Sequence, residues 1–440
     1  MNRTNDRRQA LAILPRVLLA IYRYLPLPLY ACLWLGYWLL PLARRSLEPR
    51  LAMKSLPLRG RRAIWFHAAS VGEISTIAPV VAEVRALSSG TPIVVTTMTR
   101  SGARRAGATL KYAEVALVPY DFLPSVRRFV SALEPSCLVI GETEIWPNLV
   151  AEAKRQGIPV VLVNGRISER SYPRYRLIRP FMKGVLASFD LFLMRTEIDA
   201  TRMISLGAEP ERVEVAGNTK YDILPAPLDC EARMAIRRAL NIGEATRVVT
   251  FGSAREGECE IVLKALADSR IGSLARLVIA PRHLELVPQV EQVCRSVGLS
   301  SITLAELRLP PSTGAVPEVL ILAQMGRLLE TYAISDIAIV GGTFRPFGGH
   351  NPLEPASQGC VTMVGPHIQN IKDDIRYLTS RSCAFVVTEA DLGETVARIL
   401  SRDDQRNDIG RAAIRAVEEK KGIAKKCVEA MLRRHLLPGA

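Results

Sequence analysis

The sequence predicts an α/β protein with two doubly wound domains in tandem, preceded by an apolar segment. Three observations predict this architecture. Short apolar runs alternate with amphipathic stretches, which is typical of parallel sheets covered by helices on both faces. A segment with two prolines separates two such series, and an uncharged stretch lies near the N-terminus. At 440 residues, the chain is long enough for two domains with separate cores.

Composition and proline positions divide the chain into five expected segments. Residues 1–45 form a basic and apolar membrane anchor, and residues 46–221 form the first domain. Residues 222–229 are a linker, and residues 230–410 form the second domain. Residues 411–440 form a basic C-terminal helix, whose charges we expect on a solvated face.

Ligands of doubly wound sheets bind beyond the carboxyl ends of the strands, so we expect a substrate to bind between the two domains.

Apolar runs predict the strands of the two parallel sheets. The expected strands are residues 63–67, 92–97, 137–141, 159–164 and 191–194 in the first domain, and residues 247–251, 277–280, 319–322, 337–340 and 360–364 in the second.

The expected anchor combines positive charge with apolar sequence. Residues 1–62 contain twelve Lys or Arg and two acidic residues, so they carry +10 of the net charge of +15. This combination favours the anionic surface of a membrane, and no nucleic-acid-binding motif is recognised. Residues 24–43 are uncharged, but prolines leave an uninterrupted helix only over residues 29–40, about 18 Å at 1.5 Å per residue. A membrane span and a re-entrant or interfacial anchor therefore both fit the sequence.

Polar residues collect after the expected strands of the first domain. Ser70 and Glu73 fit a helix capping box, yet a carboxylate at a helix start also fits a general base with a raised pKa. Glu142 and Glu144 lie in a loop with Trp146, and a plain turn requires neither carboxylate.

The loops of the second domain contain residues that can bind an anion or another polar ligand. Small residues around Ser253 let the backbone approach an anion, and Arg282 after the next strand can bind a phosphate. Residues 348–354 offer glycine amides, an imidazole, an amide and a carboxylate, which either bind a polar ligand or only form a tight turn. No histidine pair has zinc spacing, so we expect hydrogen-bond donors rather than metal ligands. The eight cysteines lack a CxxC pair, which is typical of reduced, buried thiols in the cytosol.

Eight motifs follow one another along the chain. They are HAASVGE (67–73), TTMTRSGARRA (96–106), VPYDF (118–122), ETEIWPN (142–148), VNGRISERSYPRY (163–175), GNTKYD (217–222), PRH (281–283) and GGHNPLEPA (348–356). On these motifs the chain resembles, over nearly its whole length, the 3-deoxy-D-manno-octulosonic acid (Kdo) transferases of lipopolysaccharide synthesis.

The resemblance implies the GT-B glycosyltransferase fold, in which two Rossmann-like domains face a cleft, with an N-terminal membrane anchor. It implies transfer of Kdo from CMP-Kdo to a lipid A precursor (lipid IVA), with inversion, at the cytoplasmic side of the cell inner membrane. The implied partners are CMP-Kdo, the lipid acceptor and the anionic inner membrane. No cofactor, metal or nucleic acid is implied.

The resemblance also implies the roles of individual residues. Glu73 matches the family's general base, and Glu142 and Lys220 match positions assigned to transition-state stabilisation. The residues that match CMP-binding segments are Pro281, Arg282, Met325, Gly326, Arg327, Asn351, Pro352, Leu353 and Glu354, with Ser253, His283, Gly349 and His350 in supporting positions. A carboxylate at Glu354 can accept hydrogen bonds from both ribose hydroxyls.

One departure from the family pattern concerns donor choice. The family usually has an acidic residue where this chain has Arg327. A divergent GT-B glycosyltransferase that uses another nucleotide sugar is therefore a second hypothesis. A non-catalytic lipid-binding paralogue is a third, although the acid and base residues are present.

Overall fold

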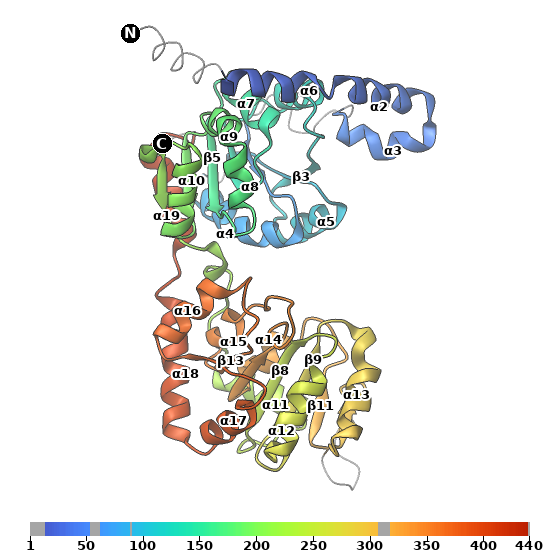
Figure 1. Cartoon of the computed structure of the whole chain (residues 1–440), viewed down its shortest axis with the longest axis vertical. Helices are drawn as coiled ribbons and strands as arrows, with labels where there is room; N and C mark the ends of the chain where they lie inside the picture. The colour runs from blue at the N-terminus through green and yellow to red at the C-terminus, as the bar shows by residue number, and fades with distance from the viewer. Residues whose placement is uncertain (1–13, 53–61, 89, 307–316, 439–440) are drawn as a thin grey trace. The chain divides into compact units, whose positions relative to one another are not determined.

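The structure is a computed structural model that describes residues 14–52, 62–88, 90–306 and 317–438. It divides into two compact units, Met1–Ile223 with Gly422–Ala440 and Leu224–Lys421. Figure 1 shows that each unit is built on its own sheet. The chain leaves the first unit inside the segment 222–229 and returns to it at Gly422.

A seven-stranded parallel sheet forms the centre of the first unit, within the described residues. Its order is β3-β2-β1-β4-β5-β6-β7. The strands are β1 (Ile64–His67), β2 (Ile93–Thr97), β3 (Glu114–Leu117), β4 (Cys137–Gly141), β5 (Val160–Gly165), β6 (Leu191–Met194) and β7 (Val213–Val215). The inner strands are buried along their whole length, because helices cover both faces.

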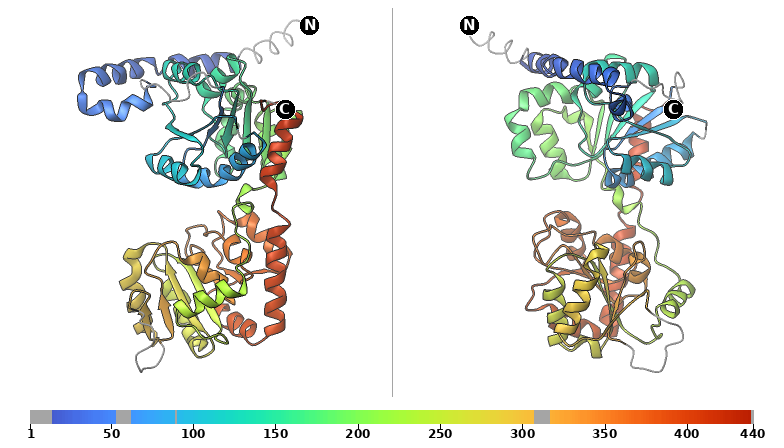
Figure 2. Two further views of the ribbon diagram at one scale, coloured as in Figure 1. Left: turned by 180° about the vertical axis from the view of Figure 1, so that it is seen from behind. Right: turned by 90° about the vertical axis from the view of Figure 1, so that its right-hand side faces the viewer.

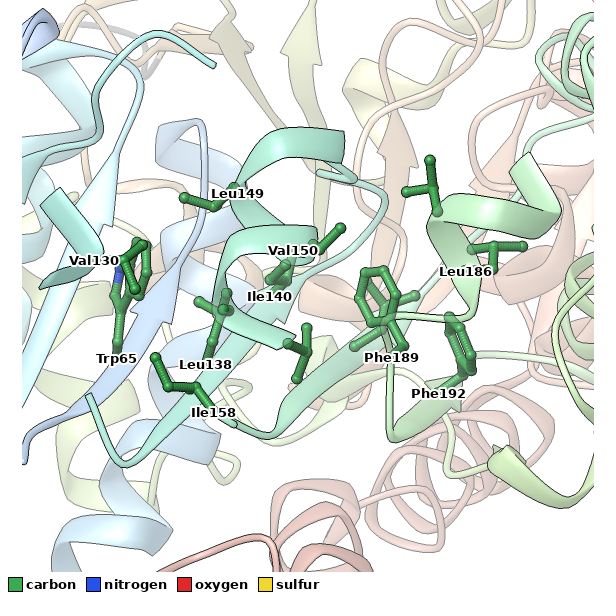
Figure 3. Close-up of a cluster of buried hydrophobic side chains, with 14 of the residues drawn as sticks. Trp65, Val130, Leu138, Ile140, Leu149, Val150, Ile158, Leu186, Phe189 and Phe192 are labelled. Carbon is green, nitrogen blue, oxygen red and sulfur yellow. The ribbon is translucent and has the colours of Figure 1, made fainter. Parts of the chain in front are cut away.

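Two hydrophobic clusters attach helices to the two faces of this sheet. Side chains alternate along each strand, so Trp65 belongs to one cluster and its neighbour Phe66 to the other. Figure 3 shows the Trp65 face, where the helices after β3, β4 and β5 pack. The helices on this face are α6 (Leu123–Leu133), α7 (Pro147–Arg155), α9 (Arg179–Leu186) and α10 (Glu197–Leu206), and α8 (Tyr172–Leu177) precedes α9; the other face carries α4 (Val71–Leu87) and α5 (Arg100–Thr109).

The second unit repeats this plan with a sheet of order β10-β11-β9-β8-β12-β13-β14. The strands are β8 (Val248–Ala254), β9 (Arg276–Pro281), β10 (Ser301–Thr303), β11 (Val319–Ile321), β12 (Ile337–Val340), β13 (Val361–Val364) and β14 (Ala384–Val386). Helices α11 (Cys230–Ala239) and α14 (Leu328–Ala333) pack on one face, and α12 (Cys259–Asp268) packs against α13 (Val287–Ser296) and α17 (Leu392–Leu400). The remaining helices are α15 (Leu353–Ser357), α16 (Lys372–Ser380) and α18 (Asp403–Glu418). Figure 2 shows this layering from two further sides.

All ten strands expected from the sequence are present, with ends that differ by at most three residues. Four further strands were not predicted from the sequence, and they are the outer strands of the two sheets: β3, β7, β10 and β14. Outer strands are short and only partly buried here, so they have no continuous apolar run to identify them.

The expectation of a single basic helix over residues 411–440 is wrong. Helix α18 ends at Glu418, Gly422 adopts φ 82°, and a separate helix α19 (Ile423–Arg433) follows. The apolar side of α19 is buried in the cluster on the α4 face, beside α4 itself. Figure 1 shows α19, in red, among the elements of the first unit. Only the basic side of α19 is solvated, and there Arg434 pairs with Glu214 at 2.8 Å.

The N-terminal segment contains a helix that is apolar and long enough to cross a membrane, by length and composition only, over Leu14–Leu39. The first thirteen residues of the expected anchor 1–45 lie outside the described residues. Near Leu25 the helix is interrupted by a turn, from which α2 (Leu27–Leu39) continues. At Leu40 the backbone is extended, and α3 (Pro41–Arg50) then packs back against α2.

Candidate active site

Candidate site residues of each unit lie after the strands at a topological switch point of its sheet, whereas Lys220 follows β7 and Arg282 follows β9. In the first sheet, β1 pairs with both β2 and β4, so the loops after β1 and β4 leave the sheet side by side in opposite directions. In the second sheet, the loops after β8 and β12 have the same relationship. Crevices for ligands form at such points, beyond the carboxyl ends of the strands.

Glu73 lies in the first turn of α4, directly after the β1 loop. The hydroxyl of Ser70 accepts a hydrogen bond from the Glu73 N–H, so the predicted cap is present. The Glu73 carboxylate accepts hydrogen bonds from the backbone N–H of Ala69 at 2.7 Å and from Ser70 Oγ at 3.0 Å. These contacts fix the orientation of the carboxylate, and capping and a role in proton transfer are therefore compatible.

The loop after β4 brings two further carboxylates to Glu73. Burial, followed by the negative charge of Glu144, raises the pKa of Glu73 to about 7, and Glu142 contributes in the same direction. Burial also raises the pKa of Glu144, although the Trp146 indole donates a hydrogen bond to it at 3.1 Å. Glu142 itself has a positive φ of 55°, an uncommon conformation for a residue with a side chain. The two neighbouring carboxylates thus add to the effect of burial and help to raise the pKa of Glu73.

Lys220 lies in a short 3-10 helix, η2 (Thr219–Tyr221), which packs against α4. Asn164 Oδ1, at the end of β5, accepts a hydrogen bond from the Thr219 N–H at 3.1 Å. Asn218 Oδ1 accepts one from the Lys220 N–H at 3.1 Å. The two asparagines therefore hold the backbone on which Lys220 is mounted. The role of Asn164 could not be predicted from local sequence, because Asn164 and Thr219 are 55 residues apart.

In the second unit, a buried carboxylate connects the two loops of the switch point. Glu258 accepts hydrogen bonds from the backbone N–H groups of Arg255 at 2.9 Å, Gly342 at 2.7 Å and Phe344 at 2.9 Å. A side chain at Gly341 would clash with the Ser253 carbonyl, so only glycine permits this approach of the loops. Glu258 directly precedes α12, and its contacts with Gly342 and Phe344 bridge more than 80 residues, so local sequence does not reveal them.

Three predicted donor-binding residues share one electrostatic environment. Burial, with the positive charges of Arg282 and Arg255, lowers the pKa of His350 to about 4, so its imidazole is neutral. Burial raises the pKa of Glu354, while a 3.1 Å hydrogen bond from Asn351 and the charge of Arg282 act in the opposite direction. His350 Nε2 is buried without a hydrogen-bond partner among the described residues. The cluster therefore offers a cation, a neutral imidazole and a carboxylate to a polar ligand.

The other predicted CMP-binding residues differ in how exposed their side chains are and in what those side chains contact. Pro352 directly precedes α15, and Leu353 is fully buried, with its N–H donating a hydrogen bond to Asn351 Oδ1 at 3.1 Å. Met325 is exposed, and Gly326 has a φ of 88°. Arg327 forms an ion pair with Glu330 on its own helix.

No group of three or more His, Cys, Asp or Glu side chains in the described part of the chain is arranged to hold a metal ion. All eight cysteines are free, and six of them are buried. His67 is fully buried beside Thr96 Oγ1, and burial lowers its pKa to about 4. These side chains belong to the cores rather than to the candidate site.

Comparison with known proteins identifies relatives that match most of the chain. The family model described as 3-deoxy-D-manno-octulosonic-acid transferase (kdotransferase) matches residues 45–223. A 3-deoxy-D-manno-octulosonic acid transferase of Haemophilus influenzae is 30% identical and covers 83% of this chain and 86% of its own. A bifunctional glycosyltransferase/methyltransferase of Fusobacterium nucleatum is 33% identical over 82% of this chain, which spans only 56% of that protein.

Solved structures show the same fold at low sequence identity. A glycosyltransferase from Rickettsia africae covers 87% of this chain with a TM-score of 0.60 and 10% identity. A UDP-GlcNAc 2-epimerase from Neisseria meningitidis covers 84% with a TM-score of 0.59 and 14% identity. Two parallel α/β units, each with its own doubly wound sheet, define the GT-B fold class. Within that class, the chain belongs to the 3-deoxy-D-manno-octulosonic acid transferase family.

Proposed function

We propose that the protein transfers Kdo from CMP-Kdo to a lipid A precursor, with Glu73 as the general base. The observation that carries this proposal is the Glu73 carboxylate, which is oriented by Ala69 and Ser70 and has a pKa of about 7. A general base is most effective when its pKa lies near the working pH. Membership of the Kdo transferase family supports the sugar that is transferred.

The proposed reaction is a single displacement. Glu73 takes the proton of an acceptor hydroxyl while that oxygen attacks the anomeric carbon of Kdo. The bond between this carbon and the CMP phosphate oxygen breaks, CMP leaves, and the configuration is inverted. Lys220 stabilises the carboxylate of the sugar and the charge that develops on CMP, and Glu142 helps to hold this arrangement.

The second unit supplies groups suited to the nucleotide. Arg282 binds the phosphate, and Glu354, held by Asn351, accepts hydrogen bonds from the ribose hydroxyls. Because Arg282 also acts on the pKa of Glu354, the two side chains lie close enough to bind one small molecule. Main-chain atoms at Gly326 provide the remaining contact, since the Arg327 side chain is engaged with Glu330.

The apolar N-terminal helices are consistent with an acceptor that resides in a membrane. Leu29, Trp34 and Trp38 of α2 are exposed, and none of the candidate spanning segment is buried. We place the protein at the cytoplasmic side of the inner membrane, where its acceptor and its soluble donor are both available. The lipid A precursor lipid IVA is the proposed acceptor.

The test is an assay of the full chain in lipid vesicles with CMP-Kdo and lipid IVA. We expect Kdo-lipid and CMP in equal amounts, and a 10²- to 10⁴-fold lower kcat for Glu73→Gln. Glu83→Gln, further along α4, is the matched control and should retain the activity of the unmodified protein. Unchanged turnover in Glu73→Gln would reject the base. A preference for UDP or GDP over CMP in competition binding would instead indicate another nucleotide sugar as donor.

A further inference from the structure

A recess in the second unit lies at the opposite edge of the sheet from the loops after β8 and β12. Its walls come from α11, the α14–β12 connection, the turn after α15 and α18. The connection and the turn lead into the amino ends of β12 and β13, which places the recess away from the carboxyl ends. The recess has a volume of about 270 Å³, many times the space that a single water molecule occupies.

The side chains that line the recess are mainly positive. Four arginines and one aspartate give it a charge of +3: Arg233, Arg237, Arg406, Arg411 and Asp336. Two of the arginines are paired with acids. Arg406 binds Asp336 and Asp403, each at 2.8 Å, and Arg411 binds Asp408 at the exposed rim.

Arg233 and Arg237 bind only neutral carbonyl groups in the contacts of the described residues. Arg233 Nη2 donates to the Gln358 carbonyl at 2.8 Å, and its Nε is buried without a hydrogen-bond partner. Arg237 donates to the carbonyls of Gly243 at 2.7 Å, Thr246 at 3.0 Å and Ile334 at 3.2 Å. Their charges are therefore solvated by dipoles and not neutralised by a carboxylate partner.

The spacing of Arg233 and Arg237 brings two positive charges close together, which favours the binding of an anion. They are four residues apart on α11, where side chains lie one above the other and like charges repel. Burial lowers the pKa of Arg237, and the positive charge of Arg233 lowers it further, although Asp336 acts in the opposite direction. A bound anion would remove this repulsion.

We propose that the recess binds the di- or triphosphate group of a small molecule, with Arg233 and Arg237 contacting its oxygens. Planar guanidinium groups match phosphate oxygens with paired hydrogen bonds, and two of them suit a chain of phosphates better than a single charge. The exposed Asn407 on α18 adds an amide at the rim. A wall formed by the close contact of Gly359 and Gly410 limits the depth of the recess.

This recess is distinct from the proposed nucleotide site, but the two sites include residues that are near one another in the sequence. Gln358 in the wall directly follows α15, whose first turn carries Glu354. Pyrophosphate binding alone is therefore ambiguous, since Arg282 can also bind phosphates. Variants confined to the recess separate the two sites.

The test is calorimetric titration of the full chain in detergent with pyrophosphate. We expect binding that weakens tenfold or more in Arg233→Gln and in Asn407→Glu, which places a carboxylate at the rim. Arg238→Gln, on the exposed side of α11, is the matched control and should bind like the unmodified protein. Asn407→Glu alters an exposed position, so it remains informative if Arg233→Gln does not fold. Absence of pyrophosphate binding, or equal affinity in Asn407→Glu and the unmodified protein, would overturn the proposal.

Discussion

Asp222 Oδ2 accepts a hydrogen bond from the backbone N–H of Ala424 at 2.6 Å, across 202 residues of the chain. Its other oxygen accepts from Gly422 at 2.6 Å and Ile423 at 3.2 Å. One carboxylate therefore satisfies the N–H groups at the start of α19. The motif that carries Lys220 ends in this residue, so it also attaches the C-terminal helix to the first unit.

Asp222→Ala removes this cap, and we expect it to lower the stability of the first unit by about 1–2 kcal/mol. Thermal unfolding monitored by circular dichroism measures the effect. Glu429→Ala, on the exposed side of α19, is the control and should leave the melting temperature unchanged. An equal melting temperature in Asp222→Ala and the unmodified protein would show that the three hydrogen bonds do not stabilise α19.

The cluster around Glu73 predicts how activity depends on pH. The base must be deprotonated, so kcat/KM should rise with pH and level off above a midpoint near 7, because the pKa of Glu73 is raised to about 7. Glu144→Gln removes a negative charge that raises this pKa, and the midpoint should move to lower pH. Glu114→Gln, which makes the same charge change on the outer strand β3, should not move it. A midpoint that stays in place in Glu144→Gln would contradict the coupling.

Replacing Glu258 should weaken nucleotide binding, although we place no contact between Glu258 and the nucleotide. Glu258→Ala leaves three backbone N–H groups without their acceptor, at a cost of about 1–3 kcal/mol for each that stays buried. The loops after β8 and β12 then separate, and we expect CMP to bind at least tenfold more weakly. Glu256→Ala, two residues away and exposed, is the matched control. Unchanged CMP affinity in Glu258→Ala would mean that the loops hold their arrangement without it.

The parts of the fold that the sequence predicted are those with a strong local signal. A buried inner strand such as β4 needs an unbroken apolar run, because helices cover both of its faces. An outer strand such as β7 is held by hydrogen bonds to one neighbour and needs no such run. The burial of one side of α19 could not be predicted from the sequence for another reason. Its apolar positions are interleaved with Lys425 and Lys426, and nothing local shows that the chain returns to the first unit.

The residues of the candidate site likewise fall into those that local sequence predicts and those that only the folded structure reveals. Glu142 and Arg282 follow strands directly, and Glu73 follows the short loop after β1, so their place at a sheet edge could be predicted from spacing. The roles of Glu258 and Asn164 depend on partners far along the chain, which strand order alone brings together. Electrostatic effects, such as the influence of Glu144 on Glu73, also require the packed structure.

The lengths and contacts of the N-terminal helices predict that they lie at the membrane interface and do not span the bilayer. Helix α2 has 13 residues, or about 20 Å, against a hydrocarbon core of about 30 Å. The preceding turns are tied to the first unit, where Tyr22 donates a hydrogen bond to Asp121 at 3.0 Å. At the far end of α2, Arg44 donates to the carbonyls of Tyr37 and Trp38, each at 3.1 Å. A cation at this position is costly in the middle of a bilayer.

The exposed Cys32 on α2 allows a direct measurement of depth. In a Cys230→Ser background, we expect a fluorophore on Cys32 to be quenched most by lipids that carry the quencher near the headgroup, because α2 is too short to span the hydrocarbon core and Arg44 lies at its end. The control is the same fluorophore on Cys230, which is exposed on α11 of the second unit, in a Cys32→Ser background. It should be quenched little at any depth. Strongest quenching of the Cys32 label by quenchers at the bilayer centre would show that α2 is inserted deeply, and the interfacial arrangement would then be wrong.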